Sequence, residues 1–90
     1  MDEVTWRRRM RWSARRGMLE IDEMFAVFLA NADFSTSRKR EQFEQLLTQS
    51  DHQLFRWFFK SENPDDLPLA QYVADVRSFV RQHIAKENGQ

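Results

Sequence analysis

The chain has 90 residues, carries 14 Lys and Arg against 14 Asp and Glu, and contains no cysteine and only two glycines. This length provides one domain with one hydrophobic core. The lack of cysteine excludes a disulfide framework, a thiolate metal site and a cysteine nucleophile. Loops that cradle a phosphate need several closely spaced glycines, so the composition also argues against a self-contained nucleotide-dependent enzyme.

The charge is unevenly distributed along the chain. Residues 1–16 contain six arginines and two acids, a local charge of +4, whereas residues 17–37 contain four acids and no base. The net charge of zero argues against a general nucleic-acid binder. No apolar run reaches the ~18 residues that cross a membrane, and the acids Asp2 and Glu3 do not fit a mitochondrial presequence. We therefore expect a soluble, cytoplasmic protein without a membrane span.

The apolar residues of the first third of the chain recur with helical spacing. Trp6 and Met10, one turn apart, predict a first helix from Val4 to Arg16, which Gly17 ends as its C′ residue. A second helix is predicted from about Met18 to Asn31. Its core-facing stripe consists of Met18, Ile21, Met24, Phe25, Phe28 and Leu29.

Two further helices are predicted in the middle of the chain. A connector over residues 32–37 leads to a third helix, which Thr36 or Ser37 caps and which buries Phe43, Leu46 and Leu47. Ser50 opens a capping box for a fourth helix over residues 51–59. This short helix is either wrapped on several sides or forms an interaction patch, because it carries five large apolar residues: Leu54, Phe55, Trp57, Phe58 and Phe59.

The last part of the chain is predicted as a loop and a closing helix. Residues 60–68 contain both prolines and three acids, and Pro68 fits the first turn of the last helix. That helix is expected to close the core with Leu69, Val73, Val76, Val80 and Ile84. The sequence thus predicts an all-α fold, a compact single-domain bundle of about five short helices over residues 1–90, with frayed ends at 1–3 and 87–90.

The stretch from Arg15 to Asp22 carries the clearest chemical signal. Because the stripe of the second helix faces inward, Leu19 points away from the core and Glu20 lies toward one flank. Arg16 brings a guanidinium fork suited to a carboxylate or a phosphate. Gly17 lets the backbone approach another surface closely or adopt a positive φ. Together these residues predict a patch that is presented to a partner.

A second interpretation of the same residues is purely structural. In it, Gly17 only ends the first helix, and Arg16 and Glu20 form a solvated i, i+4 ion pair. The residues alone leave both interpretations open. His52 and His83 have no second candidate ligand nearby in the sequence, so neither a catalytic nor a metal site is predicted.

The run Arg15-Arg16-Gly17-Met18-Leu19-Glu20-Ile21-Asp22 resembles the Arg-Gly-x-x-Glu signature of the small succinate dehydrogenase assembly (flavinylation) factors. Bacterial members of this family, the SdhE type, are also known as antitoxins. Downstream, Leu46-Leu47 followed by Asp51, Leu54, Phe55 and Trp57 is similar to a second segment of the family. The resemblance covers nearly the whole chain and departs from the usual pattern at His52 and Gln53.

The resemblance implies a five-helix assembly factor that binds the flavoprotein subunit of succinate dehydrogenase, and also that of fumarate reductase. Such a factor promotes covalent attachment of FAD to a histidine of its client. It is then not an enzyme in its own right and has no cofactor of its own, since the client carries the FAD. The residues expected to contact the partner are Arg15, Arg16, Gly17, Leu19, Glu20, Asp22, Trp12 and Trp57.

Some alternatives stay open at the level of the sequence. The arginines of the first helix, with Trp6 and Trp12 as stacking groups, would suit a nucleic-acid binder, although no nucleic acid is expected as a partner at zero net charge. An antitoxin-like role follows only from the family's second name. Trp57 has two interpretations, a core residue or a contact residue. The exposed apolar residues suit either a monomer that binds a client or a weak dimer.

Overall fold

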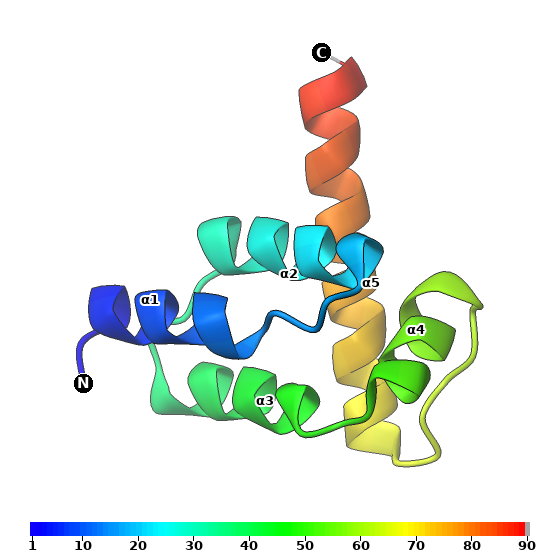
Figure 1. Cartoon of the computed structure of the whole chain (residues 1–90), viewed down its shortest axis with the longest axis horizontal. Helices are drawn as coiled ribbons and strands as arrows, with labels where there is room; N and C mark the ends of the chain where they lie inside the picture. Colours follow the sequence, from blue (N-terminus) through cyan, green and yellow to red (C-terminus); the bar gives the residue numbers. More distant parts are fainter. Residues whose placement is uncertain (90) are drawn as a thin grey trace.

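The computed structural model describes the backbone of residues 1–89 and the side chains of residues 1–85. Over these residues it has helices and no strand, which confirms the predicted all-α fold (Figure 1). The helices are α1 (Glu3–Ser13), α2 (Leu19–Asn31), α3 (Ser37–Leu47), α4 (Asp51–Phe59) and α5 (Leu67–Gly89).

Side-chain caps fix the starts of α1, α3 and α4. Thr36 accepts the Lys39 N–H at the start of α3, and Ser50 accepts the Gln53 N–H at the start of α4, as the sequence predicts. Asp2 caps α1 by accepting the Thr5 N–H at 2.7 Å, which holds the pKa of its carboxyl below the ordinary value. The helix α1 therefore begins at Glu3, within the segment 1–3 that the sequence predicts to fray.

The end of α1 also differs from the prediction. The helix ends at Ser13 rather than Arg16, and Ala14 is its C-cap. The following backbone turns away because the N–H groups of Arg16 and Gly17 are bonded to the Asp22 carboxylate instead of to helix carbonyls. Gly17 thus lies within the connection to α2 and is not the C′ residue of α1.

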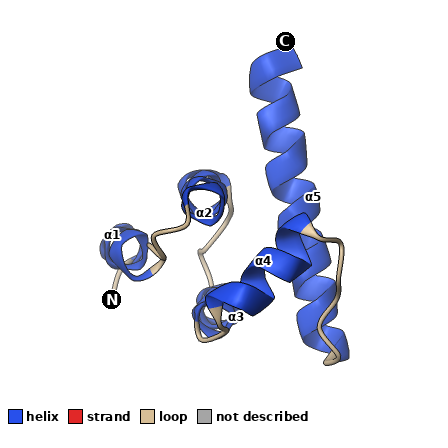
Figure 2. Cartoon of the chain, turned by 45° about the vertical axis from the view of Figure 1, so that its right-hand side comes forward, coloured by secondary structure: helices blue, strands red, loops and turns tan. Residues whose placement is uncertain are grey.

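The helices are arranged in two directions. In Figure 1, α1, α2 and α3 lie across the view and α5 runs across them, and in Figure 2, α1 and α2 are seen nearly end-on beside an upright α5. The closest helix pairs are α1 with α2, α2 with α5, and α4 with α5. The central position of α2 explains why its predicted stripe, apart from half-buried Met18, is buried.

Aromatic rings fill much of the core. The Trp6 ring lies 4.7 Å from the Phe34 ring, and Phe28 and Phe43 pack on the same group at ring distances of 5.5 and 5.7 Å from Phe34. Phe34 is only 1% exposed although it lies in the segment predicted merely as a connector. A single aromatic residue between two helices has no periodicity, so the sequence pattern missed it.

The last helix is longer than predicted. It continues to Gly89, through part of the segment 87–90 that was expected to fray, and Gln90 lies outside the described residues. Its C-terminal part extends beyond α2 and leaves the body of the molecule (Figure 1). Val73, Val76 and Val80 close the core as predicted, but Ile84 is 43% exposed and does not. Ile84 instead lines an open groove together with residues of α2 and α4, which do not cover it.

Candidate functional site

The connection between α1 and α2 is held in one conformation by Asp22. Its carboxylate accepts the Arg16 N–H at 2.8 Å and the Gly17 N–H at 3.3 Å, and its own N–H donates to the Met18 carbonyl at 2.9 Å. Asp22 lies in the first turn of α2, where the helix dipole favours a negative charge. Asp22, which the sequence analysis includes among the expected partner contacts, therefore stabilises the turn through hydrogen bonds inside this chain.

Gly17 occupies the most unusual backbone position of this turn. Its φ of +81° is a conformation that side-chain-bearing residues rarely adopt, and a Cβ built there would meet no described atom within 4 Å. Glycine is thus needed for the backbone angle and not for packing inside this chain. The positive φ agrees with the sequence prediction, and the space beside the Gly17 backbone is open.

Arg16 is turned inward rather than presented as a free fork. Its guanidinium donates to the carbonyl of Leu47, the last residue of α3, and lies 3.4 Å from the carboxylate of Asp51, the first residue of α4. Only 18% of its side chain is exposed. The structure therefore does not show the solvated Arg16–Glu20 ion pair that the sequence left open. Arg16 instead connects the turn to the corner between α3 and α4.

Four side chains around the turn face the solvent. Trp12 is 71% exposed and Leu19 is 68% exposed, as the helical spacing predicts for Leu19. Arg15 is exposed and its guanidinium lies 5.1 Å from the centre of the Trp12 ring, a cation–π arrangement. Glu20 is exposed in the first turn of α2. Trp12, one of the residues expected to contact the partner, therefore lies next to Arg15 at the start of the Arg15–Asp22 run.

Trp57 lies elsewhere. It is 8% exposed and belongs to the hydrophobic core, together with its neighbours Leu54 and Phe58. Of the two interpretations that the sequence left open, the core residue is the one the structure supports. Phe55 is half-buried and Phe59 is 43% exposed, so α4 buries one side and leaves the other accessible.

The arginine-rich first helix contributes to the fold through Arg7. Its guanidinium donates to the carbonyls of Leu29 and Ala32 at the end of α2, pairs with Glu3 at 2.6 Å and lies 5.0 Å from the Phe34 ring centre. A cation at a helix C-terminus satisfies carbonyls that have no partner within the helix. The sequence did not predict the contacts of Arg7 with the end of α2, nor the contact of Arg16 with Asp51. Both sets of contacts depend on how helices that are distant in the sequence meet.

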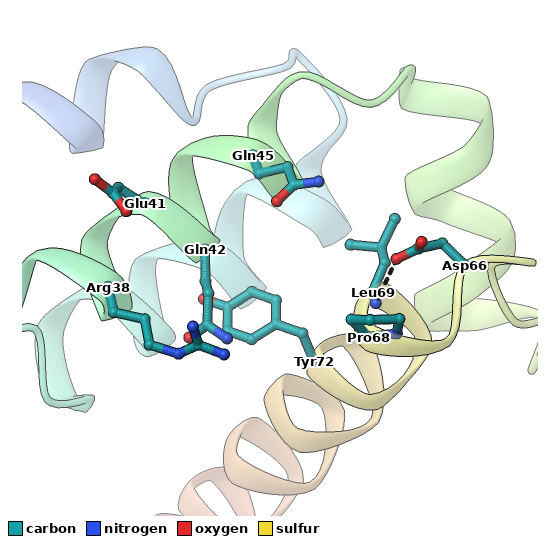
Figure 3. Close-up of a pocket in the computed structure, with 8 residues that line it drawn as sticks. All are labelled: Arg38, Glu41, Gln42, Gln45, Asp66, Pro68, Leu69 and Tyr72. Atoms are coloured by element: carbon teal, nitrogen blue, oxygen red, sulfur yellow. Dashed lines mark hydrogen bonds between the residues drawn. The ribbon is translucent and has the colours of Figure 1, made fainter.

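A separate hollow lies between α3 and α5, away from the turn. Tyr72 reaches from α5 toward Gln42 and Arg38 of α3, and Asp66 caps α5 by accepting the Leu69 N–H at 2.9 Å (Figure 3). The Tyr72 hydroxyl is buried without a hydrogen-bond partner among the described residues, and burial raises the pKa of this tyrosine well above 10.0. The hollow and its unpartnered hydroxyl thus lie between α3 and α5 and are not part of the turn between α1 and α2.

Over residues 1–89, none of the helices is long and apolar enough to cross a membrane. Groups of three or more His, Cys, Asp or Glu side chains suited to a metal ion are not found in the part of the chain whose placement is described.

Comparisons with known proteins identify the relatives of this chain. Residues 8–80 match the model of a family described as flavinator of succinate dehydrogenase. The chain is 37% identical over 76 residues to the FAD assembly factor SdhE of Idiomarina loihiensis, covering 83% of this chain and 84% of the relative. It is 44% identical over 71 residues to the protein of the same name from Shewanella oneidensis, covering 77% and 85%.

The corresponding protein of Colwellia psychrerythraea is 41% identical over 74 residues, with 81% of each chain covered. No solved structure gives a significant match. The family match spans α2, α3 and α4 completely, and it includes the turn that carries Gly17. On this evidence, the chain belongs to the family of succinate dehydrogenase flavinators.

Proposed function

We propose that this protein binds the flavoprotein subunit of succinate dehydrogenase and promotes the covalent attachment of FAD to that subunit. Membership of the flavinator family and similarity to FAD assembly factors support the overall role. The finer proposal, direct binding through the turn between α1 and α2, rests on the geometry of that turn.

The observation that carries the proposal is a turn that hydrogen bonds hold in place, with exposed contact groups beside it. Asp22 fixes the backbone, Gly17 offers an open approach at φ +81°, and Trp12 and Leu19 expose large apolar side chains beside it. Exposed aromatic and apolar residues around a preorganised backbone are typical of the energetically dominant part of a protein interface. Glu20 adds a charge that can orient the client.

In this proposal the turn positions the client and takes no part in bond formation. The client supplies both the FAD and the histidine to which it becomes attached, and this chain has no cofactor of its own. The turn holds the FAD-loaded subunit in the geometry in which its histidine can react with the flavin. This orientation raises the rate of covalent attachment, because the reactive arrangement is populated more often. Trp12, Arg15, Leu19 and Glu20 make the direct contacts, while Arg16 and Asp22 hold the backbone that presents them.

The proposal is tested in cells that lack this protein. Covalent flavin on the succinate dehydrogenase flavoprotein is measured by in-gel fluorescence after rescue with wild type, Glu20→Ala or Glu41→Ala. Glu41 is a matched control, since it is an exposed glutamate on α3. We expect full rescue by wild type and Glu41→Ala and a clear loss of covalent flavin with Glu20→Ala. Equal rescue by all three would refute the role of Glu20, and no effect of the deletion would refute the function.

The same assay extends to a second client. We propose that the flavoprotein subunit of fumarate reductase, which the family resemblance also implies as a client, is bound through the same turn. Covalent flavin on that subunit should then show the same order of rescue. If the variants rescued covalent flavin in a different order on the two flavoproteins, a shared contact surface would be contradicted.

A further inference from the structure

An apolar groove of about 800 Å³ lies between α2, α4 and α5. Val27 of α2, Phe59 of α4, and Val80 and Ile84 of α5 line it, and Phe59 and Ile84 are each 43% exposed. Val80 and Ile84 lie on the part of α5 that forms one wall of the groove, and the helix itself continues past α2 (Figures 1 and 2).

The two rims of the groove carry opposite charges. Glu20 and Glu23 stand on the α2 side, and Arg77 and Arg81 stand on the α5 side. Among the described residues no ion pair joins these two rims. Glu20, Glu23 and Arg81 are exposed, so these charges are available to a third element that lies between the rims.

The groove is continuous with the turn through Glu20, which belongs to both surfaces. A molecule that contacts Leu19 therefore lies next to Glu20 and the acidic rim of the groove. From this continuity and the charge pattern we infer that the groove holds an amphipathic helix of the flavoprotein client. The inference rests on the proposed function and adds a second contact surface to it.

Backbone chemistry favours a helix as the occupant. The walls of the groove are helices, and they offer no sheet edge that could pair with an extended strand. A strand would leave its N–H and C=O groups unpaired against apolar side chains, whereas a helix satisfies them internally. This is the helix-in-groove mode, in which residues at i, i+3, i+4 and i+7 provide the anchors.

The dimensions and charges define the occupant further. The segments Glu20–Val27 and Arg77–Ile84 that line the groove each extend over about 10 Å at 1.5 Å per residue, which is about two turns of helix. The occupant should carry an apolar stripe between a basic flank, which faces Glu20 and Glu23, and an acidic flank, which faces Arg81. A second copy of this chain fits less well, because a two-fold contact would bring one concave surface against the same concave surface.

The test measures binding of the purified succinate dehydrogenase flavoprotein subunit to wild type, Ile84→Asp and Leu67→Asp. Leu67 is a matched control on the same helix, because it is 80% exposed and lies at the opposite end of α5, outside the groove. We expect Ile84→Asp to weaken binding at least tenfold and Leu67→Asp to bind as wild type does. Circular dichroism checks that both variants keep the helical fold, and Arg81→Glu provides a second groove variant.

The outcomes separate the groove from the turn. If wild type binds and both Ile84→Asp and Arg81→Glu bind equally well, the groove proposal is overturned while the proposed function stands. If wild type does not bind, the proposed function fails and the groove proposal fails with it. A photo-crosslinker at position 84 should capture a client peptide with one basic and one acidic flank. Sedimentation that shows a dimer of the free wild type, lost in Ile84→Asp, would instead assign the groove to a second copy.

Discussion

The guanidinium of Arg16 lies 3.4 Å from the carboxylate of Asp51, a residue 35 positions further along the chain. The same guanidinium donates to the Leu47 carbonyl at the end of α3. One side chain thus connects the turn between α1 and α2 to the corner between α3 and α4. Arg16 of the Arg-Gly motif therefore has a structural task inside this protein, and its contribution to client binding passes through the position of the turn.

This relationship predicts different effects for the two partners. Arg16→Ala should lower the free energy of unfolding by about 1–2 kcal/mol, because it removes charge-assisted hydrogen bonds of a side chain that is mostly buried. Asp51→Asn should cost less than about 1 kcal/mol, because the Asp51 side chain is 45% exposed. Urea unfolding followed by circular dichroism measures both. A larger loss from Asp51→Asn than from Arg16→Ala would contradict this assignment.

Substitutions of Gly17 separate backbone strain from client contact. Gly17→Val should lower the free energy of unfolding by about 1–2 kcal/mol, because a β-branched residue is strained at φ +81°. Gly17→Asn should cost much less, since asparagine tolerates the left-handed region. Both should reduce covalent flavin on the client at least tenfold, measured by in-gel fluorescence. Normal flavinylation with Gly17→Asn would show that the client does not approach this backbone closely.

The two tryptophans Trp12 and Trp57 should behave in opposite ways. Trp57 is 8% exposed, so Trp57→Ala should lower the free energy of unfolding by about 3–5 kcal/mol. Trp12 is 71% exposed, so Trp12→Ala should change it by less than about 0.5 kcal/mol and should weaken binding of the flavoprotein subunit. Thermal unfolding and a binding titration measure the two quantities. Unchanged client binding by Trp12→Ala would remove Trp12 from the contact surface.

The arginines of α1 divide into one structural residue and several surface residues. Arg7→Gln should lower the free energy of unfolding by about 1–2 kcal/mol, because the carbonyls of Leu29 and Ala32 lose a charged donor. Arg8→Gln, one position along on an exposed site, should change it by less than about 0.5 kcal/mol. Urea unfolding of the two variants under identical conditions provides the comparison, and equal effects would argue against the capping role.

The buried hydroxyl of Tyr72 predicts a pH effect. The raised pKa means that the folded protein keeps this proton more firmly than the unfolded chain. Its contribution to stability is therefore complete below the ordinary pKa of 10.0 and is lost as the pH rises above it. Tyr72→Phe removes a buried group without a partner, so it should keep or raise stability at pH 7. Unfolding curves from pH 7 to 11 should show a smaller alkaline loss in Tyr72→Phe than in wild type.

Helix periodicity and local capping were enough to predict much of the fold. The stripe of α2, the caps at Thr36 and Ser50, and the outward direction of Leu19 all depend on residues a few positions apart. Side-chain spacing along one helix fixes these features, and the sequence contains that spacing directly. The Arg-Gly-x-x-Glu run likewise pointed to this turn, because its residues are close together in the sequence.

The tertiary structure decided what depends on contacts between distant segments. The Asp22 carboxylate ends α1 earlier than its periodicity suggests, and Arg16 turns inward to the end of α3. Ile84 continues the apolar stripe of α5 but is 43% exposed, because it lines an open groove that α2 and α4 border without covering it. A repeat along one helix says which face is apolar, whereas only the positions of the other helices determine whether that face is buried or left for a partner.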